Sequence, residues 1–218
     1  MIRIGPWIAD YAYAAGRQLG SIFGGRDVTV LASGDRAPVV MIPGVWETWR
    51  FLGPLARLIN ARGHPVHVLP ELGSNRGSVA AMAAVAQRFI EARNLDGVII
   101  VAHSKGGLIG KHLMLGASGS RVSRLIAIAT PFAGSAYASF LPVRSLRLFR
   151  PDDETILLLA RDVATNARIV SIYPRFDPHI PGGSGLRGAT NVELPIDGHF
   201  RILRHPLLIQ AVADHLEA

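Results

Sequence analysis

The stretch "VIIVAHSKGGLIG", residues 98–110, decides how this chain is interpreted. It opens with an unbroken apolar run, as a strand buried on both faces would, and continues with glycines and apolar residues that suit a helix. Ser104 stands at the junction, with Ala102 two residues before it and Gly106 two residues after it. A nucleophile on a sharp strand-to-helix turn needs small flanking residues, because strand and helix approach closely there. The pattern predicts that Ser104 is a nucleophile; an ordinary glycine-rich turn is the alternative.

Strand-like and helix-like patterns alternate along the chain around this stretch. We expect strands within 37–44, 65–73, 97–103, 124–130, 168–174 and 189–195, and helices within 47–64, 78–94, 105–116 and 205–218. Such alternation predicts βαβ units, and hence the α/β class with a mostly parallel central sheet and helices on both faces. The one long departure, 131–167, is where a short cap would lie.

The composition is that of a folded domain without cysteine chemistry. The 218 residues are 49% hydrophobic and 18% charged, which predicts one domain over 1–218. With no cysteine, disulfides, zinc–thiolate sites and cysteine nucleophiles are excluded. The net charge is +7, but the arginines are scattered without basic runs, so we expect no nucleic-acid partner.

The N-terminal residues 1–26 predict a helical extension. Apolar and aromatic residues recur there at helical spacing, and Pro6 suits a first helical turn. Packing on the domain is one interpretation of this segment, and peripheral membrane contact through 6–23 or a surface for a partner is the other. A membrane span needs about 20 apolar residues and a secretory signal needs a clean apolar core. Neither pattern is present in the sequence, so we predict a cytoplasmic location.

An acid and a base follow Ser104 at the ends of later predicted strands. Asp177 lies in "SIYPRFDPHIPGG", 171–183, within a loop stiffened by three prolines, and His199 lies in "LPIDGHFRIL", 194–203, after Gly198. The carboxyl ends of parallel strands meet at one edge of a sheet. The order Ser104, Asp177, His199 therefore predicts a nucleophile, an orienting acid and a general base.

Other acids and histidines compete for these roles. Asp197 is the competing acid, but it precedes His199 by only two residues and is poorly placed to brace the far ring nitrogen. His103 adjoins Ser104, yet neighbouring side chains on a strand point in opposite directions. His179 is expected to line the substrate pocket.

The stretch "IPGVWETW", 42–49, follows an earlier predicted strand and supplies the second oxyanion donor. A serine hydrolase needs two backbone N–H groups aimed at the developing oxyanion. One belongs to the residue after the nucleophile, Lys105, and the other to a loop that Gly44 lets pass close to the substrate, which points to Val45. An ordinary Pro-Gly turn is the alternative.

With these residues assembled, the chain resembles the α/β-hydrolase superfamily, specifically small bacterial lipases and esterases. The likeness runs from about residue 36 to the C-terminus and is carried by "VVMIPGVWETW", "VIIVAHSKGGL", "IAIATPFAGS", "SIYPRFDPHIPG" and "IDGHFRIL". It implies a three-layer α/β-hydrolase fold. Two departures stand out: Pro43 replaces the histidine of many lipases, and the 131–167 insertion is too short for a large lid.

The residues and the resemblance together predict carboxylic-ester hydrolysis, with a small-molecule or lipid ester as partner and neither metal nor organic cofactor. Thioesterase, amidase or acyltransferase chemistry, or lipid-surface binding without catalysis, are the alternatives. The sequence leaves the oligomeric state open. The aromatic and aliphatic residues expected to hold the acyl group, each of which also suits a core, are Trp46, Trp49, Phe132, Phe140 and Leu141.

Overall fold

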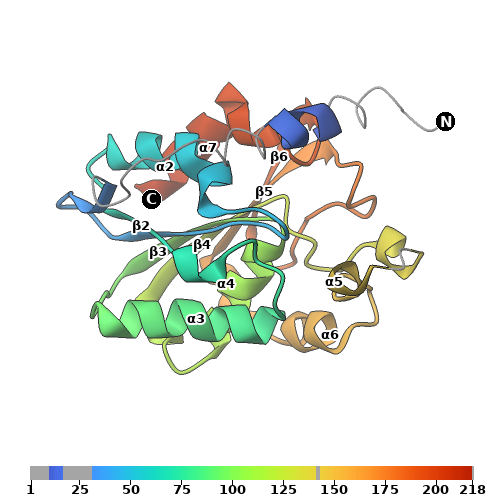
Figure 1. Cartoon of the computed structure of the whole chain (residues 1–218), viewed down its shortest axis with the longest axis horizontal. Helices are drawn as coiled ribbons and strands as arrows, with labels where there is room; N and C mark the ends of the chain where they lie inside the picture. The colour runs from blue at the N-terminus through green and yellow to red at the C-terminus, as the bar shows by residue number, and fades with distance from the viewer. Residues whose placement is uncertain (1–9, 17–30, 141–142, 218) are drawn as a thin grey trace.

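A six-stranded sheet forms the middle of the protein (Figure 1). The computed structural model describes residues 10–16, 31–140 and 143–217. Within these residues the strands lie in the order β2-β1-β3-β4-β5-β6, and every neighbouring pair is parallel. The predicted α/β class and parallel sheet are confirmed. The strands are β1 (Val39–Ile42), β2 (Val66–Val68), β3 (Val98–His103), β4 (Val122–Ile128), β5 (Ile169–Phe176) and β6 (Thr190–Asp197).

The central strands β1 and β3 are buried along their whole length. Their unbroken apolar runs suit this position, because a side chain on either face enters a core. Ile42 at the end of β1 pairs with Ala102, and His103 at the end of β3 pairs with Ile128. The carboxyl ends of these strands therefore meet at one edge, where the loops of the site begin.

Helices cover both faces of the sheet, as predicted (Figure 1). One face packs against α2 (Gly53–Asn60) and α7 (Pro206–Leu216), and the other against α3 (Val79–Ala92) and α4 (Lys105–Leu115). α3 begins after Ser78, whose hydroxyl accepts a hydrogen bond from the N–H of Ala81 at 3.1 Å. The short 3-10 turns are η2 (Trp49–Leu52), η3 (Pro70–Leu72), η4 (Gly119–Arg121), η5 (Ala136–Ser139), η6 (Ala164–Arg168) and η7 (Arg201–Arg204).

The segment 131–167 carries two short helices beside the sheet. These are α5 (Arg144–Arg147) and α6 (Glu154–Arg161), and both lie at one end of the molecule in Figure 1. Ile156 and Leu159 of α6 join the core beneath α4. Residues from η5 and α5 line a cavity described below, so this insertion forms part of the site's wall.

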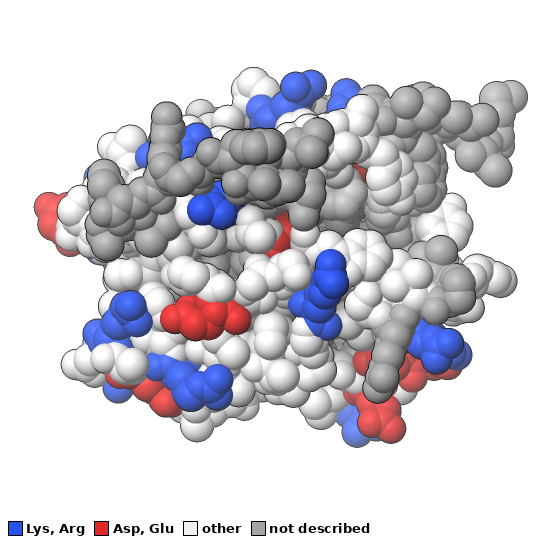
Figure 2. Space-filling view, viewed as in Figure 1, with Lys and Arg blue, Asp and Glu red and all other residues white. Residues whose placement is uncertain are grey.

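Part of the N-terminal extension is visible as a helical turn over 10–16. Tyr13 and Ala14 pack against the core cluster on the α2 and α7 face. The rest of the predicted extension, 1–9 and 17–26, lies outside the described residues. Among the described helices, none combines the length and apolar character needed to cross a membrane. On the face drawn in Figure 2, acidic side chains lie among the basic ones, which are spread out rather than gathered in one patch.

Candidate active site

Ser104 occupies a strained turn between β3 and α4. Its backbone has φ 52° and ψ −120°, a conformation that non-glycine residues seldom adopt. The N–H of Ser104 donates to the carbonyl of Ile128 at 2.8 Å, and the hydroxyl of Thr130 donates to the carbonyl of Ser104 at 3.0 Å. The neighbouring strand β4 and the loop after it therefore hold the turn in place.

The small residues around Ser104 are required by close backbone approach. A Cβ atom on Gly106 would collide with the carbonyl oxygen of Ile42, and one on Gly107 would collide with the side chain of Thr130. Ala102 is fully buried between the neighbouring strands. The steric reason for the "AHSKGG" pattern is thus visible in the packing of α4 against β1 and the loop after β4.

His199 and Asp177 meet Ser104 at this edge of the sheet. The Nε2 atom of His199 lies 3.0 Å from the Oγ of Ser104, and its Nδ1 lies 2.8 Å from the Oδ2 of Asp177. Asp177 follows β5 directly, and His199 follows β6 after Gly198. Since Nδ1 donates to the carboxylate, Nε2 is left to accept the serine hydroxyl proton. The competing acid, Asp197, has its Oδ1 atom 3.6 Å from a guanidinium nitrogen of Arg175.

The Asp177 carboxylate is fixed and ionised. Its Oδ1 accepts the N–H groups of His179 at 2.8 Å and Ile180 at 3.1 Å, while Oδ2 faces His199. Burial alone would raise the pKa of Asp177, but the charge and hydrogen bond of His199 and the N–H of His179 outweigh it. The pKa of Asp177 is consequently held below its usual value.

The pKa of His199 is raised. Burial alone would lower it, but the charge and hydrogen bond of Asp177, assisted by the charges of Asp10 and Glu47, exceed that effect. The imidazolium form is thus stabilised by three buried carboxylates. A base that takes the proton of Ser104 needs such stabilisation at the moment when it becomes charged.

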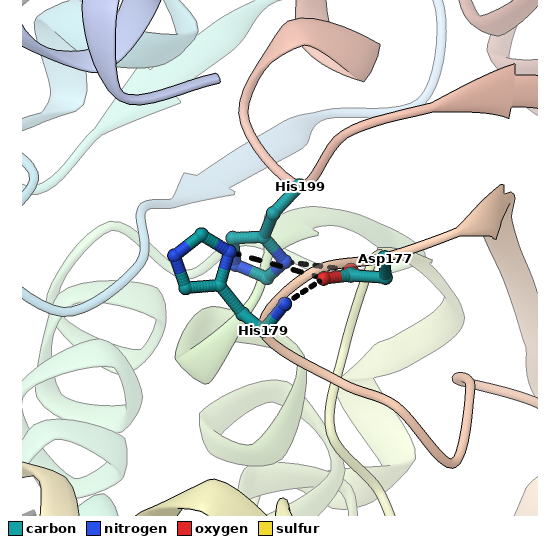
Figure 3. Close-up of side chains that lie close together, drawn as sticks. All are labelled: Asp177, His179 and His199. Carbon is teal, nitrogen blue, oxygen red and sulfur yellow. Dashed lines mark hydrogen bonds and ion pairs between the residues drawn. The ribbon is translucent and has the colours of Figure 1, made fainter. Parts of the chain in front are cut away.

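His179 lines the cavity and lies against His199 and Asp177 (Figure 3). Its ring centroid is 4.9 Å from that of His199, and its Nε2 is 3.0 Å from the hydroxyl of Tyr11. Burial and the neighbouring histidines lower the pKa of His179 to about 3, so the ring is neutral near pH 7.

Asp177, His179 and His199 place three metal-binding atoms within 4.8 Å of one another. Such a set has the chemistry to hold a cation. Here, however, the Nδ1 of His199 is engaged with Asp177 at hydrogen-bond distance, and its Nε2 with Ser104. The arrangement is therefore accounted for by hydrogen bonding between the three side chains and their neighbours.

The loop after β1 contains a charged residue that the sequence interpretation missed. Glu47 is buried, and its Oε2 accepts the N–H of Gly44 at 2.6 Å. Its two carboxylate oxygens lie 2.8 Å and 3.0 Å from the Nδ1 of His103. The available signal was that Glu47 is the only acidic residue in the stretch 42–49. A carboxylate that is buried needs a partner.

His103 also contacts the loop that carries His199. Its Nε2 lies 3.1 Å from the backbone carbonyl oxygen of His199, and the two ring centroids are 4.9 Å apart. A carbonyl oxygen only accepts, so the Nε2 of His103 carries a proton and donates it to the His199 carbonyl, while Nδ1 faces the Glu47 carboxyl group. The ring of His103 thus contacts the backbone of His199 rather than Ser104.

The side chain of Lys105 is buried beside the turn. Its ammonium group donates to the backbone and side-chain oxygens of Asn75 at 2.8 Å and 3.2 Å, and to the carbonyl of Gly77. Burial lowers the pKa of Lys105 to about 8. The backbone N–H of Lys105 opens α4, where a helix has no internal acceptor for it.

Ser104 and His199 open into a largely apolar cavity of about 690 Å³. Among the predicted acyl-binding residues, the structure brings Trp46 and Phe140 to its wall. Trp49 and Phe132 instead pack in the core on opposite faces of the sheet. Leu141 lies outside the described residues. Other lining residues are Tyr11, Ala14, Ala15, Val45, Phe51, Tyr137, Ala138, Leu146, Phe149, Ile180 and Phe200.

Comparison with known proteins identifies the fold. The chain matches no family model and no curated protein sequence. Among solved structures, it superposes on Aspergillus fumigatus lipase B with a TM-score of 0.68 and 17% identity, over 86% of this chain but 54% of that lipase. An α/β-hydrolase enzyme from lagoon-sediment metagenome of Mar Chica, Morocco, gives 0.61 at 15% identity, over 85% and 92% of the two chains. Paleococcus ferrophilus monoacylglycerol lipase gives 0.60 at 15% identity, over 83% and 95%. The chain therefore has the α/β-hydrolase fold.

Proposed function

We propose that this protein is a serine hydrolase that cleaves carboxylic esters. One observation carries the proposal: Ser104, His199 and Asp177 form an unbroken hydrogen-bonded series, 3.0 Å and 2.8 Å long, at the floor of an apolar cavity. The resemblance in fold to two lipases supports the same reaction class.

The reaction proceeds in two stages at Ser104. His199 removes the hydroxyl proton, and the Oγ attacks the ester carbonyl carbon to form a tetrahedral intermediate. The intermediate collapses as His199 protonates the leaving alcohol, which leaves the acyl group on Ser104. His199 then takes a proton from water, whose oxygen attacks the acyl carbon. As the bond to Ser104 breaks and the acid is released, His199 returns this proton to the Oγ of Ser104. Asp177 keeps the imidazole oriented throughout.

Two backbone N–H groups serve the oxyanion in this proposal. Lys105 offers the first N–H of α4, beside Ser104, where the helix dipole also favours negative charge. Along the loop after β1, the N–H of Gly44 is engaged by Glu47, so Val45 is the next donor facing the cavity. The Glu47 contact fixes the turn that presents it.

The cavity wall favours an acyl group without charge. Its described lining is aromatic and aliphatic apart from the catalytic residues, Glu47, Ser135 and the neutral His179. Glu47 is already paired with His103, so the described lining presents no unpaired charge to a substrate carboxylate or ammonium. Aliphatic and aromatic acyl esters, from small molecules or from lipids, fit this lining. The predicted membrane contact through 6–23 stays a prediction.

The test is hydrolysis of p-nitrophenyl esters, from acetate to palmitate, by the protein and its Ser104→Ala variant. We expect turnover to fall by about 10⁴- to 10⁶-fold without the nucleophile. Ser120→Ala is the control, because Ser120 is exposed in η4 at the opposite edge of the sheet. The chain-length profile then distinguishes an esterase from a lipase.

A fluorophosphonate probe supports this assay, because it labels an activated serine regardless of the acyl substrate. Labelling at Ser104 without ester turnover would contradict simple ester hydrolysis and indicate thioesters or amides as substrates. The absence of both would contradict serine hydrolysis altogether.

A further inference from the structure

Asp10, far from the catalytic residues in sequence, is buried against the catalytic histidine loop. It belongs to the N-terminal helical turn, and its side chain is fully shielded from solvent. Its carboxylate accepts three backbone N–H groups: from His199 at 3.0 Å, and from Phe200 and Arg201 at 2.9 Å each. Hydrogen bonds to an ionised carboxylate are stronger than neutral ones, so this is a firm attachment.

The loop has no internal partner for these donors. Residues 199–201 lead into η7, and Phe200, which precedes its first residue, provides no side-chain cap. Such orphan N–H groups need an acceptor when they are buried. Gly198, with φ 113°, brings the backbone so close that a Cβ there would lie 2.8 Å from the Oδ1 of Asp10. The loop and the carboxylate are fitted to each other.

We propose that Asp10 is a positioning residue that sets the backbone of the His199 loop and adds negative charge behind the base. This inference rests on the proposed function and deepens it. Asp177 orients the imidazole ring, whereas Asp10 holds the peptide N–H of the same residue. On the other side, His103 holds its carbonyl oxygen. The ring and the main chain of His199 are therefore fixed by different partners.

The rest of the N-terminal turn is tied to the same site. Tyr11, Ala14 and Ala15 line the cavity, and the Tyr11 hydroxyl meets His179. The ring of Tyr13 stands edge-on to Phe51 with centroids 6.4 Å apart. Because these contacts anchor the turn without Asp10, a change of its carboxylate acts mainly on the His199 loop.

The charge of Asp10 also contributes to the raised pKa of His199. A purely structural attachment would not have this effect, which makes the pKa of the ring an independent readout. The titratable or charged groups that face His199 from the surrounding elements are Asp10, Glu47, His103, Asp177 and His179.

The experiment compares full-length Asp10→Asn and Asp10→Glu with the unaltered protein. Asp96→Asn is the matched control, since Asp96 is exposed in the loop between α3 and β3. Two quantities are measured: the rate of fluorophosphonate labelling of Ser104, and the pKa of His199 by NMR of its ring. Where esters are hydrolysed, kcat and KM are measured as well.

For Asp10→Asn we expect labelling and kcat to fall roughly 10- to 100-fold, because a displacement of about 1 Å in a catalytic group has such an effect. KM should change little, and the pKa of His199 should fall. Asp10→Glu keeps the charge and should restore part of the rate and the higher pKa. Equal labelling and an unmoved pKa in folded Asp10→Asn would overturn the proposal.

Hydrogen exchange in the unaltered protein gives a second test that needs no substitution. The amide protons of residues 199–201 should exchange slowly and together, because one carboxylate holds all three. Rapid exchange of these amides would overturn the proposal even if Asp10→Asn does not fold. An unlabelled Ser104 in the unaltered protein would instead refute the proposed function, while the pKa and exchange measurements would still decide the role of Asp10.

Discussion

The two partners of the Ser104–His199 hydrogen bond are held in place in opposite ways. Ser104 is positioned by its own neighbourhood, with β3 before it, α4 after it and the adjoining residues Ile128 and Thr130 against it. His199 is positioned by polar side chains from three separate segments: Asp177, His103 and Asp10. The position of Ser104 therefore depends on steric fit, whereas the position of His199 depends on buried polar groups.

This difference sets what each partner is sensitive to. Steric fit does not change with pH, but it tolerates no added atom. Buried charges respond to pH and to the loss of any one member. Substitutions around Ser104 and around His199 should therefore differ in how they change the rate, the stability and the pH dependence.

The largest effect should come from Asp177, the acid proposed to orient His199. Asp177→Asn is expected to lower kcat by about 10⁴-fold, because an amide can hold His199 in the wrong tautomer. Folding should be little changed. The assay is ester hydrolysis, with Asp197→Asn as the control, since Asp197 contacts Arg175 rather than His199. A larger loss in Asp197→Asn than in Asp177→Asn would assign the acid to the other residue.

The next largest effect should come from the pair of Glu47 and His103, which joins the loop after β1 to the loop of His199. Glu47 contacts the oxyanion loop at Gly44, and through His103 it reaches the His199 backbone. Glu47→Gln removes one partner of this buried pair, and breaking a buried ion pair should lower the free energy of unfolding by about 3–5 kcal/mol. Urea denaturation measures it. The exposed Glu71→Gln is the control, and equal stability of the two variants would show that the pair is uncharged.

A smaller loss of stability is expected at the nucleophile side. A Cβ on Gly106 meets the backbone of Ile42 and Pro43, so Gly106→Ala should lower the free energy of unfolding by about 1–3 kcal/mol. For a chain of this size, Tm should fall by roughly 2–4 °C per kcal/mol. Gly182→Ala is the control, because no atom lies within 4 Å of its added Cβ. Matching Tm values would refute the steric account.

The smallest effect is a displacement of the pH profile. His199 acts as a base only when neutral, and its pKa is raised, so kcat/KM should fall as pH drops through a midpoint above the usual value of about 6.5. The pKa of Asp177 is lowered, so this carboxylate stays ionised over the same range. Asp177→Asn should move the midpoint to lower pH. A midpoint below the usual histidine value in the unaltered protein would contradict the charge-based account.

The sequence predicted the structure well where the pattern depends on residues that are close together in the chain. The alternating patterns located the described strands and main helices, because a sheet covered on both faces demands unbroken apolar runs. Ser104, Asp177 and His199 came together because parallel strands end at one edge of the sheet. Those are local patterns combined with one rule of topology.

Contacts across the chain could not be inferred in the same way. Asp10 lies in a mostly apolar and aromatic segment, and nothing in the neighbouring sequence indicates a partner near residue 199. Trp49 and Phe132 were expected at the substrate, but an aromatic residue fits a core or a cavity equally well until the packing is known. Glu47 follows one predicted strand and His103 ends another, yet their pairing depends on how β1 and β3 adjoin.

The Asp10 contact also has a consequence for biosynthesis. Synthesis runs from the N-terminus, so the residues that build the serine turn have all been made by Thr130, whereas Arg201 of the clamped loop comes 71 residues later (201 − 130). At about 5–20 residues per second, roughly 4–14 s separate the two events. For nearly all of that interval the nascent chain contains Ser104 but not yet His199. Asp10 can therefore meet its three N–H partners only after Arg201 has been synthesised, long after the turn at Ser104 can form.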